Sequence, residues 1–199
     1  MASLSQNKDT NSTSDLKANV KRIALLIDFK FEDLEATYPN IRLAEEQGFV
    51  VDIIGIHKAG MKYTGKFGYP LKSTHCIDDI VPSDYSAVVI PGGFAPDYMR
   101  RSEGMKNLVT TLMKLNRVVA AICHGPWMLC SARYEDNTPV CKGRRVTCFE
   151  AIKDDVINAG ADYVANESVV VDGNLITAQT PNDLTPWCLA IIDAIKKNN

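Results

Sequence analysis

The amino-acid sequence predicts an α/β fold in which helices cover both faces of a mostly parallel sheet. From residue 21 onward, short apolar runs alternate with longer helical patterns, the order expected of strands joined by helical crossovers. Several runs are apolar throughout, as strands buried on both faces are. Ligand sites in such sheets lie at the carboxyl ends of the strands, so functional residues are expected there.

The predicted elements of the first half follow this alternation. Residues 22–28 form an apolar strand, and residues 32–47 form a helix that Gly48 ends in a left-handed turn. The remaining elements are a strand at 49–56, a loop with a hairpin at 61–71, a strand at 85–90 and a helix at 102–115.

The second half continues the same pattern and ends in a hairpin and a helix. Asp172-Gly173-Asn174 lies between two apolar runs and is typical of a β-hairpin turn. The predicted elements are a strand at 117–122, a helix at 125–133, a polar surface loop at 135–142, a strand at 145–148, a helix at 151–159, the hairpin strands at 168–171 and 175–178, and a helix at 183–197.

Composition limits the classes of protein that fit. Residues 1–20 contain six Ser or Thr and three Asn without an aromatic residue, which predicts a flexible polar tail before one domain at 21–199. The net charge of −2 argues against nucleic-acid binding. The longest apolar run, residues 118–123, is far shorter than the ~18 residues of a membrane helix. Six cysteines without a CxxC pair, and no secretory signal, predict reduced thiols and a cytoplasmic location.

The most informative segment is Ala121-Ile122-Cys123-His124-Gly125-Pro126. Small residues two positions before and after Cys123 match the spacing of a nucleophile elbow, a sharp strand-to-helix turn that projects one reactive side chain. We expect the following helix and its unpaired N–H groups to lower the pKa of Cys123 and favour the reactive thiolate. The alternative is a small apolar residue at the end of a buried strand.

Residues next to the elbow supply further candidates. His124 is not expected to face the sulfur, because adjacent side chains on a helix diverge. The roles left for it are lining the pocket, protonating a substrate oxygen or pairing with a carboxylate. Gly92 and Gly93 follow the strand at 85–90. Their N–H groups are expected to point into the cleft and form an oxyanion hole with the His124 N–H. A surface histidine and a simple tight turn are the alternatives.

Three acidic residues open the first helix. Acidic residues in a first turn usually complement the helix dipole on a solvated face, and this is the interpretation for Glu32 and Asp33. Glu35 differs because Pro39, four residues later, has no N–H for its carbonyl. We expect the Glu35 carboxyl, held against a thiolate, to have a raised pKa and to act as a proton donor.

Together these motifs resemble the PfpI family of the ThiJ/PfpI superfamily. The segment 121–126 is similar to the active-site motif of that family, and the resemblance extends over residues 21–197. The supporting segments are Phe31-Glu32-Asp33-Leu34-Glu35 with Tyr38-Pro39, Thr64-Gly65-Lys66 with Gly68-Tyr69, Pro91-Gly92-Gly93 with Ala95-Pro96, Ile152-Lys153-Asp154-Asp155 with Asn158-Ala159-Gly160, and Val170-Val171-Asp172-Gly173-Asn174.

The resemblance implies a flavodoxin-like three-layer sandwich related to class I glutamine amidotransferase domains. It implies Cys123 as nucleophile, His124 as its active-site neighbour and Glu35 as the carboxyl that hydrogen-bonds the thiolate. Gly93 and the His124 backbone become the oxyanion donors. It also implies a homodimer or higher homo-oligomer in which an acid of the partner subunit completes the triad. Here that position is Asp97, one methylene shorter than the glutamate of the family.

Two further departures concern the pocket. Phe94 stands where relatives often carry a basic residue, and the extra loop at 135–139 is expected to reshape the mouth of the pocket. The sequence contains no metal-ligand spacing and no GxGxxG motif, so we expect no metal and no cofactor.

The resemblance implies a small aldehyde or a glycated molecule as substrate. The activities of the family are a glutathione-independent glyoxalase that converts methylglyoxal to lactate, a protein deglycase, and a PfpI-type cysteine hydrolase. Two alternatives stay open. One is a redox stress sensor or chaperone that uses oxidation of Cys123 to a sulfinate. The other is a structural domain with a vestigial site.

Overall fold

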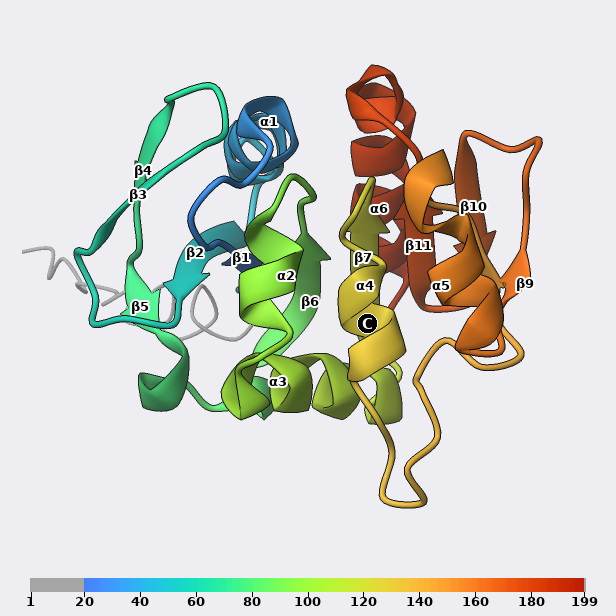
Figure 1. Ribbon diagram of the computed structural model, residues 1–199. Helices are drawn as coiled ribbons and strands as arrows, with labels where there is room; N and C mark the ends of the chain where they lie inside the picture. Colours follow the sequence, from blue (N-terminus) through green and yellow to red (C-terminus); the bar gives the residue numbers. More distant parts are fainter. Residues whose placement is uncertain (1–19, 199) are drawn as a thin grey trace, which may run out of the picture.

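The computed structural model describes residues 20–198, so the predicted tail lies outside the described residues except for Val20. Neighbouring strands of the central sheet are parallel except for the antiparallel β10–β11 hairpin, which confirms the predicted class (Figure 1). The seven strands lie in the order β10 (Val169–Asp172), β11 (Leu175–Ala178), β7 (Val118–Ile122), β6 (Tyr85–Ile90), β1 (Lys21–Leu26), β2 (Phe49–Gly55) and β5 (His75–Cys76).

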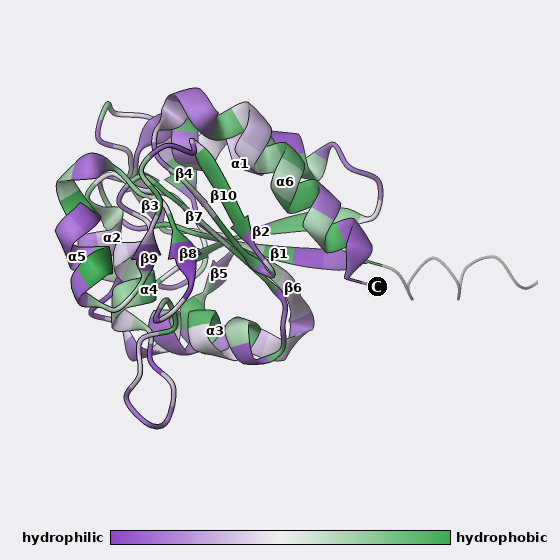
Figure 2. Cartoon of the chain, turned by 90° about the vertical axis from the view of Figure 1, so that its right-hand side faces the viewer, coloured by the Kyte–Doolittle hydropathy of each residue, from purple (hydrophilic) through white to green (hydrophobic). Residues whose placement is uncertain are grey.

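Helices form a layer on each face of this sheet. Figure 2 shows the hydrophobic strands enclosed between the two layers. One face carries α1 (Asp33–Ala44) and α6 (Leu184–Lys197), which also pack on each other. The other face carries α2 (Ala95–Met99), α3 (Glu103–Lys114), α4 (Trp127–Ser131) and α5 (Lys153–Asn158). The result is the three-layer sandwich expected from the sequence.

The core follows directly from the apolar runs. Residues 23–27, 87–90 and 118–122 are almost completely shielded from solvent, because these strands lie between helices on both sides. On α3, the buried residues recur at helical spacing, and Ser102 caps the helix by accepting the Met105 N–H at 3.3 Å. The buried apolar stripe of α3 consists of Met105, Leu108, Val109, Leu112 and Met113.

Short elements differ most from the expectations. The hairpin predicted at 61–71 is confirmed as β3 (Lys62–Thr64) and β4 (Pro70–Lys72). The strand predicted at 145–148 is reduced to β8 (Arg145–Val146), which pairs with β9 (Asp162–Tyr163) outside the central sheet. Strand β5 and helix α2 were not predicted, because two and five residues are too few to show a periodic pattern.

Four single turns of 3₁₀ helix complete the secondary structure of residues 20–198. They are Ile77–Asp79, Pro82–Asp84, Glu150–Ile152 and Pro181–Asp183.

None of the helices in the described part of the chain has the length and apolar character that crossing a membrane requires.

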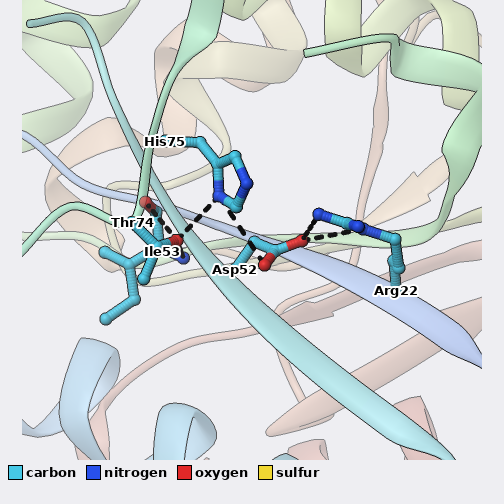
Figure 3. A network of polar contacts seen from close by, with 5 residues as sticks. All are labelled: Arg22, Asp52, Ile53, Thr74 and His75. Carbon is cyan, nitrogen blue, oxygen red and sulfur yellow. Dashed lines mark hydrogen bonds and ion pairs between the residues drawn. The ribbon is translucent and has the colours of Figure 1, made fainter. Parts of the chain in front are cut away.

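An ionic network joins β1, β2 and the edge strand β5 (Figure 3). Asp52 is 6% exposed and accepts hydrogen bonds from Arg22 Nε at 3.0 Å and Nη2 at 2.6 Å. His75 Nδ1 lies 3.6 Å from Asp52 Oδ1 and 2.9 Å from Thr74 Oγ1. The Ile53 N–H in turn donates to Thr74 Oγ1 at 2.8 Å. The buried carboxylate is therefore the hub that ties the last parallel strand to the sheet.

Replacing this hub is expected to destabilise the fold. Asp52→Asn removes the ion pair with Arg22, and hydrogen bonds to charged groups contribute about 2 kcal/mol, so we expect the free energy of unfolding to fall by that order. Chemical denaturation measures the difference. Glu103→Gln is the matched control, because Glu103 forms an exposed pair with Lys106 and such pairs contribute little. An equal fall in the free energy of unfolding in Asp52→Asn and Glu103→Gln would contradict the prediction.

Candidate active site

Cys123 follows β7 directly, at the turn predicted from the sequence. Its φ is +59°, in the left-handed region that non-glycine residues rarely adopt. Gly125 permits this turn, because a Cβ there would lie 2.4 Å from the carbonyl oxygen of Ile90. The Gly125 N–H donates to the Ile122 carbonyl at 2.7 Å. The geometry is that of a nucleophile elbow, as the spacing of small residues predicts.

His124 faces the sulfur, in contrast to the expectation from helix geometry. The distance from Cys123 Sγ to His124 Nδ1 is 3.3 Å. Residues 123–126 form turns, and α4 begins only at Trp127. The divergence of adjacent side chains on a helix therefore does not apply, and the positive φ of Cys123 brings the two side chains together.

Aromatic rings fix the orientation of His124. The ring of Phe149 stacks on it with centroids 5.1 Å apart and an interplanar angle of 28°, and Trp127 meets it at 5.1 Å and 68°. The Trp127 Nε1–H donates to Asp155 Oδ2 at 3.0 Å. Burial, followed by the charge of Lys66, lowers the pKa of His124. The imidazole is therefore neutral near pH 7 and able to accept a proton.

Glu35 reaches the same point from the first turn of α1. It is fully buried, and its Oε2 accepts the Gly92 N–H at 2.7 Å. The carboxyl lies beside the Cys123 thiol. Burial raises the pKa of Glu35 to about 7, against the opposing effect of the Gly92 N–H bond. The structure thus places the Glu35 carboxyl where the sequence analysis expects it. Its pKa is raised, as predicted, but by burial and not by the sulfur, whose hydrogen bond lowers it.

The other two acids of this turn are also buried, so their assignment to a solvated face is wrong. Glu32 accepts the Glu35 N–H at 2.9 Å and caps α1. Asp33 accepts the Phe67 N–H at 2.9 Å and the Tyr69 N–H at 2.8 Å. Both carboxylates therefore hold backbone in place: Glu32 fixes the start of the helix, and Asp33 fixes the loop between β3 and β4.

The two glycines after β6 have different roles. Gly92 gives its N–H to Glu35, so the expectation that it donates to an oxyanion is wrong. A Cβ at Gly92 would lie 2.7 Å from Glu35 Oε2, 2.8 Å from Cys123 Cβ and 2.8 Å from the His124 nitrogen. Gly93 has a φ of +75°, and its N–H and that of His124 act on the Cys123 sulfur by lowering the pKa of the thiol. These two N–H groups are the available oxyanion donors.

The prediction that Cys123 has a lowered pKa is wrong. Burial and then the neighbouring Glu35 carboxylate raise the pKa of Cys123 to about 12, although the N–H groups of His124 and Gly93 act in the opposite direction. Helix α4 has five residues and starts four positions after Cys123, so its dipole contributes little. Two adjacent buried anions would repel each other, so the thiol and the carboxyl hold one proton between them above pH 7.

A pocket of about 310 Å³ opens onto the Cys123 sulfur. Several of its residues were not predicted as site residues, because they come from remote segments: the β3–β4 loop, α4, and the turns before α5 and α6. The Gly65-Lys66 turn in the sequence was a usable signal for one of them. The pocket is lined by Glu32, Glu35, Lys66, Gly93, Phe94, Cys123, His124, Trp127, Phe149 and Pro181.

Two expectations concern features that lie away from this pocket. Asp97 on α2 is half-exposed and pairs with Arg101; its contact with His124 across a subunit interface stays a prediction. The loop at 135–139 lines a separate open groove beside α3, of about 440 Å³, so it does not reshape the pocket mouth. Within residues 20–198, no three His, Cys, Asp or Glu side chains gather as metal ligands.

The raised pKa of Cys123 gives a testable result. Glu35→Gln removes the negative charge beside the thiol, so we expect the pKa of Cys123 to fall below that of the unmodified protein. The measurement is the rate of iodoacetamide alkylation against pH, followed by mass spectrometry, with Cys123→Ser to assign the modified residue. A midpoint that is unchanged or moves to higher pH in Glu35→Gln would show that the carboxylate does not raise the pKa of the thiol.

Known proteins are similar in sequence to most of this chain. YraA of Bacillus subtilis, by its name a candidate cysteine protease, is 40% identical over 176 residues, which cover 88% of this chain and 99% of that protein. Deglycase PfpI of Pyrococcus furiosus is 38% identical over 175 residues, with the same coverage.

A solved structure gives the same result for the fold. It is a two-domain protein of Anabaena variabilis with dj-1/thij/pfpi-like and ferritin-like domains, and it matches at a TM-score of 0.81 and 38% identity. The match covers 88% of this chain and 48% of that one. The flavodoxin-like, class I glutamine amidotransferase-like sandwich is thereby confirmed. Residues 21–194 match the sequence model of the DJ-1/PfpI family. The chain therefore belongs to the DJ-1/PfpI family.

Proposed function

We propose that this protein is a cysteine-dependent enzyme that attacks small reactive carbonyl compounds, of the deglycase or glutathione-independent glyoxalase type. The observation that carries the proposal is the meeting of three groups in one pocket. Cys123 Sγ lies 3.3 Å from His124 Nδ1, and the buried Glu35 carboxyl lies beside the same thiol. A nucleophile with two adjacent proton carriers fits addition to a carbonyl.

The first step is addition of the sulfur to the aldehyde carbon. The Glu35 carboxylate takes the thiol proton as the S–C bond forms, and the electron pair of the carbonyl moves to its oxygen. The N–H groups of Gly93 and His124, which border the sulfur, stabilise this developing negative charge. The protonated Glu35 then gives the same proton to the oxygen, so the step yields a neutral hemithioacetal.

For a 2-oxoaldehyde, the neutral His124 continues the reaction. Its ring accepts the proton of the former aldehyde carbon, and an enediolate forms with its negative charge on the former ketone oxygen. The protonated ring then gives this proton to the second carbon, and the hydroxyl proton of the first carbon passes to the oxygen of the second. The product is a thioester of Cys123, from which water releases a 2-hydroxy acid and the free thiol. Methylglyoxal and one water thus become lactate, with no external oxidant or reductant.

The dimensions of the pocket favour a small substrate over a polypeptide. Cys123 is 7% exposed, and the pocket that reaches it measures about 310 Å³. An extended peptide requires an open groove on both sides of the nucleophile, whereas a compact carbonyl compound fits this enclosed volume.

The proposed nucleophile is tested by Cys123→Ser. We expect conversion of methylglyoxal to lactate to be lost, because a serine hydroxyl in this position is a much weaker nucleophile. Cys76→Ser is the matched control, since Cys76 lies on the edge strand β5 outside the pocket, and it should retain activity. Undiminished lactate formation by Cys123→Ser would rule out the proposal. Oxidation of Cys123 by mild peroxide, without any turnover in the unmodified protein, would favour a sensor instead.

The pH dependence follows from the raised pKa of Glu35. Attack requires the ionised carboxylate, so kcat/KM should rise with pH through about 7 and fall as the pH drops below it. Ionisation of His124 does not cause this rise of kcat/KM near pH 7, because burial lowers the pKa of His124. In Glu35→Gln, kcat should fall by roughly 100-fold or more, and the limb near pH 7 should disappear. A profile of unchanged shape in this variant would contradict the assigned role.

A further inference from the structure

The walls of the active-site pocket are mainly apolar and aromatic. Phe94, Trp127, Phe149 and Pro181 line it together with Cys123. They come from the turn after β6, from the first residue of α4, and from the turns that precede α5 and α6. Once a carbonyl carbon is bonded to the sulfur, its substituent lies in this same pocket, so these side chains contact the part of the substrate that does not react.

Phe94 is the most exposed of these walls, and its position is nevertheless fixed. Its ring is 61% exposed, although apolar side chains are normally buried. The Phe94 N–H donates to the Lys30 carbonyl at 2.8 Å, and the Lys30 ammonium lies 5.8 Å from the centre of the ring. This cation–π contact and the backbone bond hold the ring at the mouth of the pocket.

The volume of the pocket exceeds what a methyl group can fill. A protein cavity of about 150 Å³ accommodates benzene, and this pocket measures about 310 Å³. The methyl group of methylglyoxal leaves most of the apolar wall in contact with water. A phenyl group covers more of that wall and removes more apolar surface from water, which increases binding in proportion to the area.

We propose that this pocket prefers 2-oxoaldehydes with an aromatic or bulky apolar substituent over methylglyoxal, and that Phe94 determines the preference. The inference rests on the proposed function of Cys123 and specifies its substrate class. The family resemblance does not imply it, because relatives often carry a basic residue at this position, as noted above.

The test compares phenylglyoxal with methylglyoxal in the full-length protein. The unmodified protein should convert phenylglyoxal to mandelate with a kcat/KM about tenfold above that for methylglyoxal. Phe94→Ala should lower kcat/KM about tenfold for phenylglyoxal and less than about twofold for methylglyoxal, since one apolar contact is worth roughly this factor. Phe94→Leu should preserve most of the preference, and Phe94→Arg should abolish it.

Phe67→Ala is the matched control. Phe67 is another exposed aromatic residue, 77% exposed, and it does not line the pocket, so both substrates should be converted as before. The inference would be overturned if Phe94→Ala left the ratio of the two kcat/KM values unchanged. If Cys123→Ser still abolished conversion of both substrates, the proposed function would stay intact. Failure of the unmodified protein to convert either substrate would overturn the proposed function itself.

Discussion

Three segments of the chain meet at the α-carbon of Gly92 with no space for a side chain. A Cβ there would lie within 2.8 Å of Glu35, Cys123 and the His124 backbone at once. This close approach exists because β6 and β7 are parallel neighbours that end at the same edge of the sheet. Gly93 adds an antiparallel bridge to the segment before α1. The arrangement of the site is therefore a consequence of sheet topology combined with two adjacent glycines.

The same close packing determines the chemistry of the pair formed by Glu35 and Cys123. Exclusion of water penalises the ionised form of both groups. The Glu35 carboxylate also disfavours ionisation of the thiol, whereas the hydrogen bond from the thiol favours the ionised carboxylate. The result is a proton that stays on the sulfur above pH 7, beside an ionised carboxylate, with little free thiolate at rest. In the proposed reaction, the oxygen of the incoming carbonyl group receives this proton by way of Glu35. Such an arrangement limits reaction of the sulfur with unrelated electrophiles in its resting state.

The sequence predicted the long elements and the elbow because both depend on local patterns. The buried strands are visible as apolar runs, and Gly125 and Ala121 mark the turn around Cys123. The pKa of the thiol could not be predicted in the same way, since it depends on burial and on a carboxyl 88 positions earlier in the chain. Aromatic walls such as Phe149 were missed for a related reason, because only the folded chain brings their segments together.

The shortness of β5 has a consequence for how molecules of this protein meet one another. The parallel sheet ends on this side in a strand of two residues, His75–Cys76, which the ionic network around Asp52 ties to β2. A long, flat terminal strand would offer a row of free backbone groups on which another chain could add by β-pairing. Two residues offer very little of such a template. The part of β2 that β5 leaves without a strand partner, residues 49–52, carries the buried Asp52 carboxylate and its ion pair with Arg22, and a charge of this kind opposes pairing with a strand of another molecule.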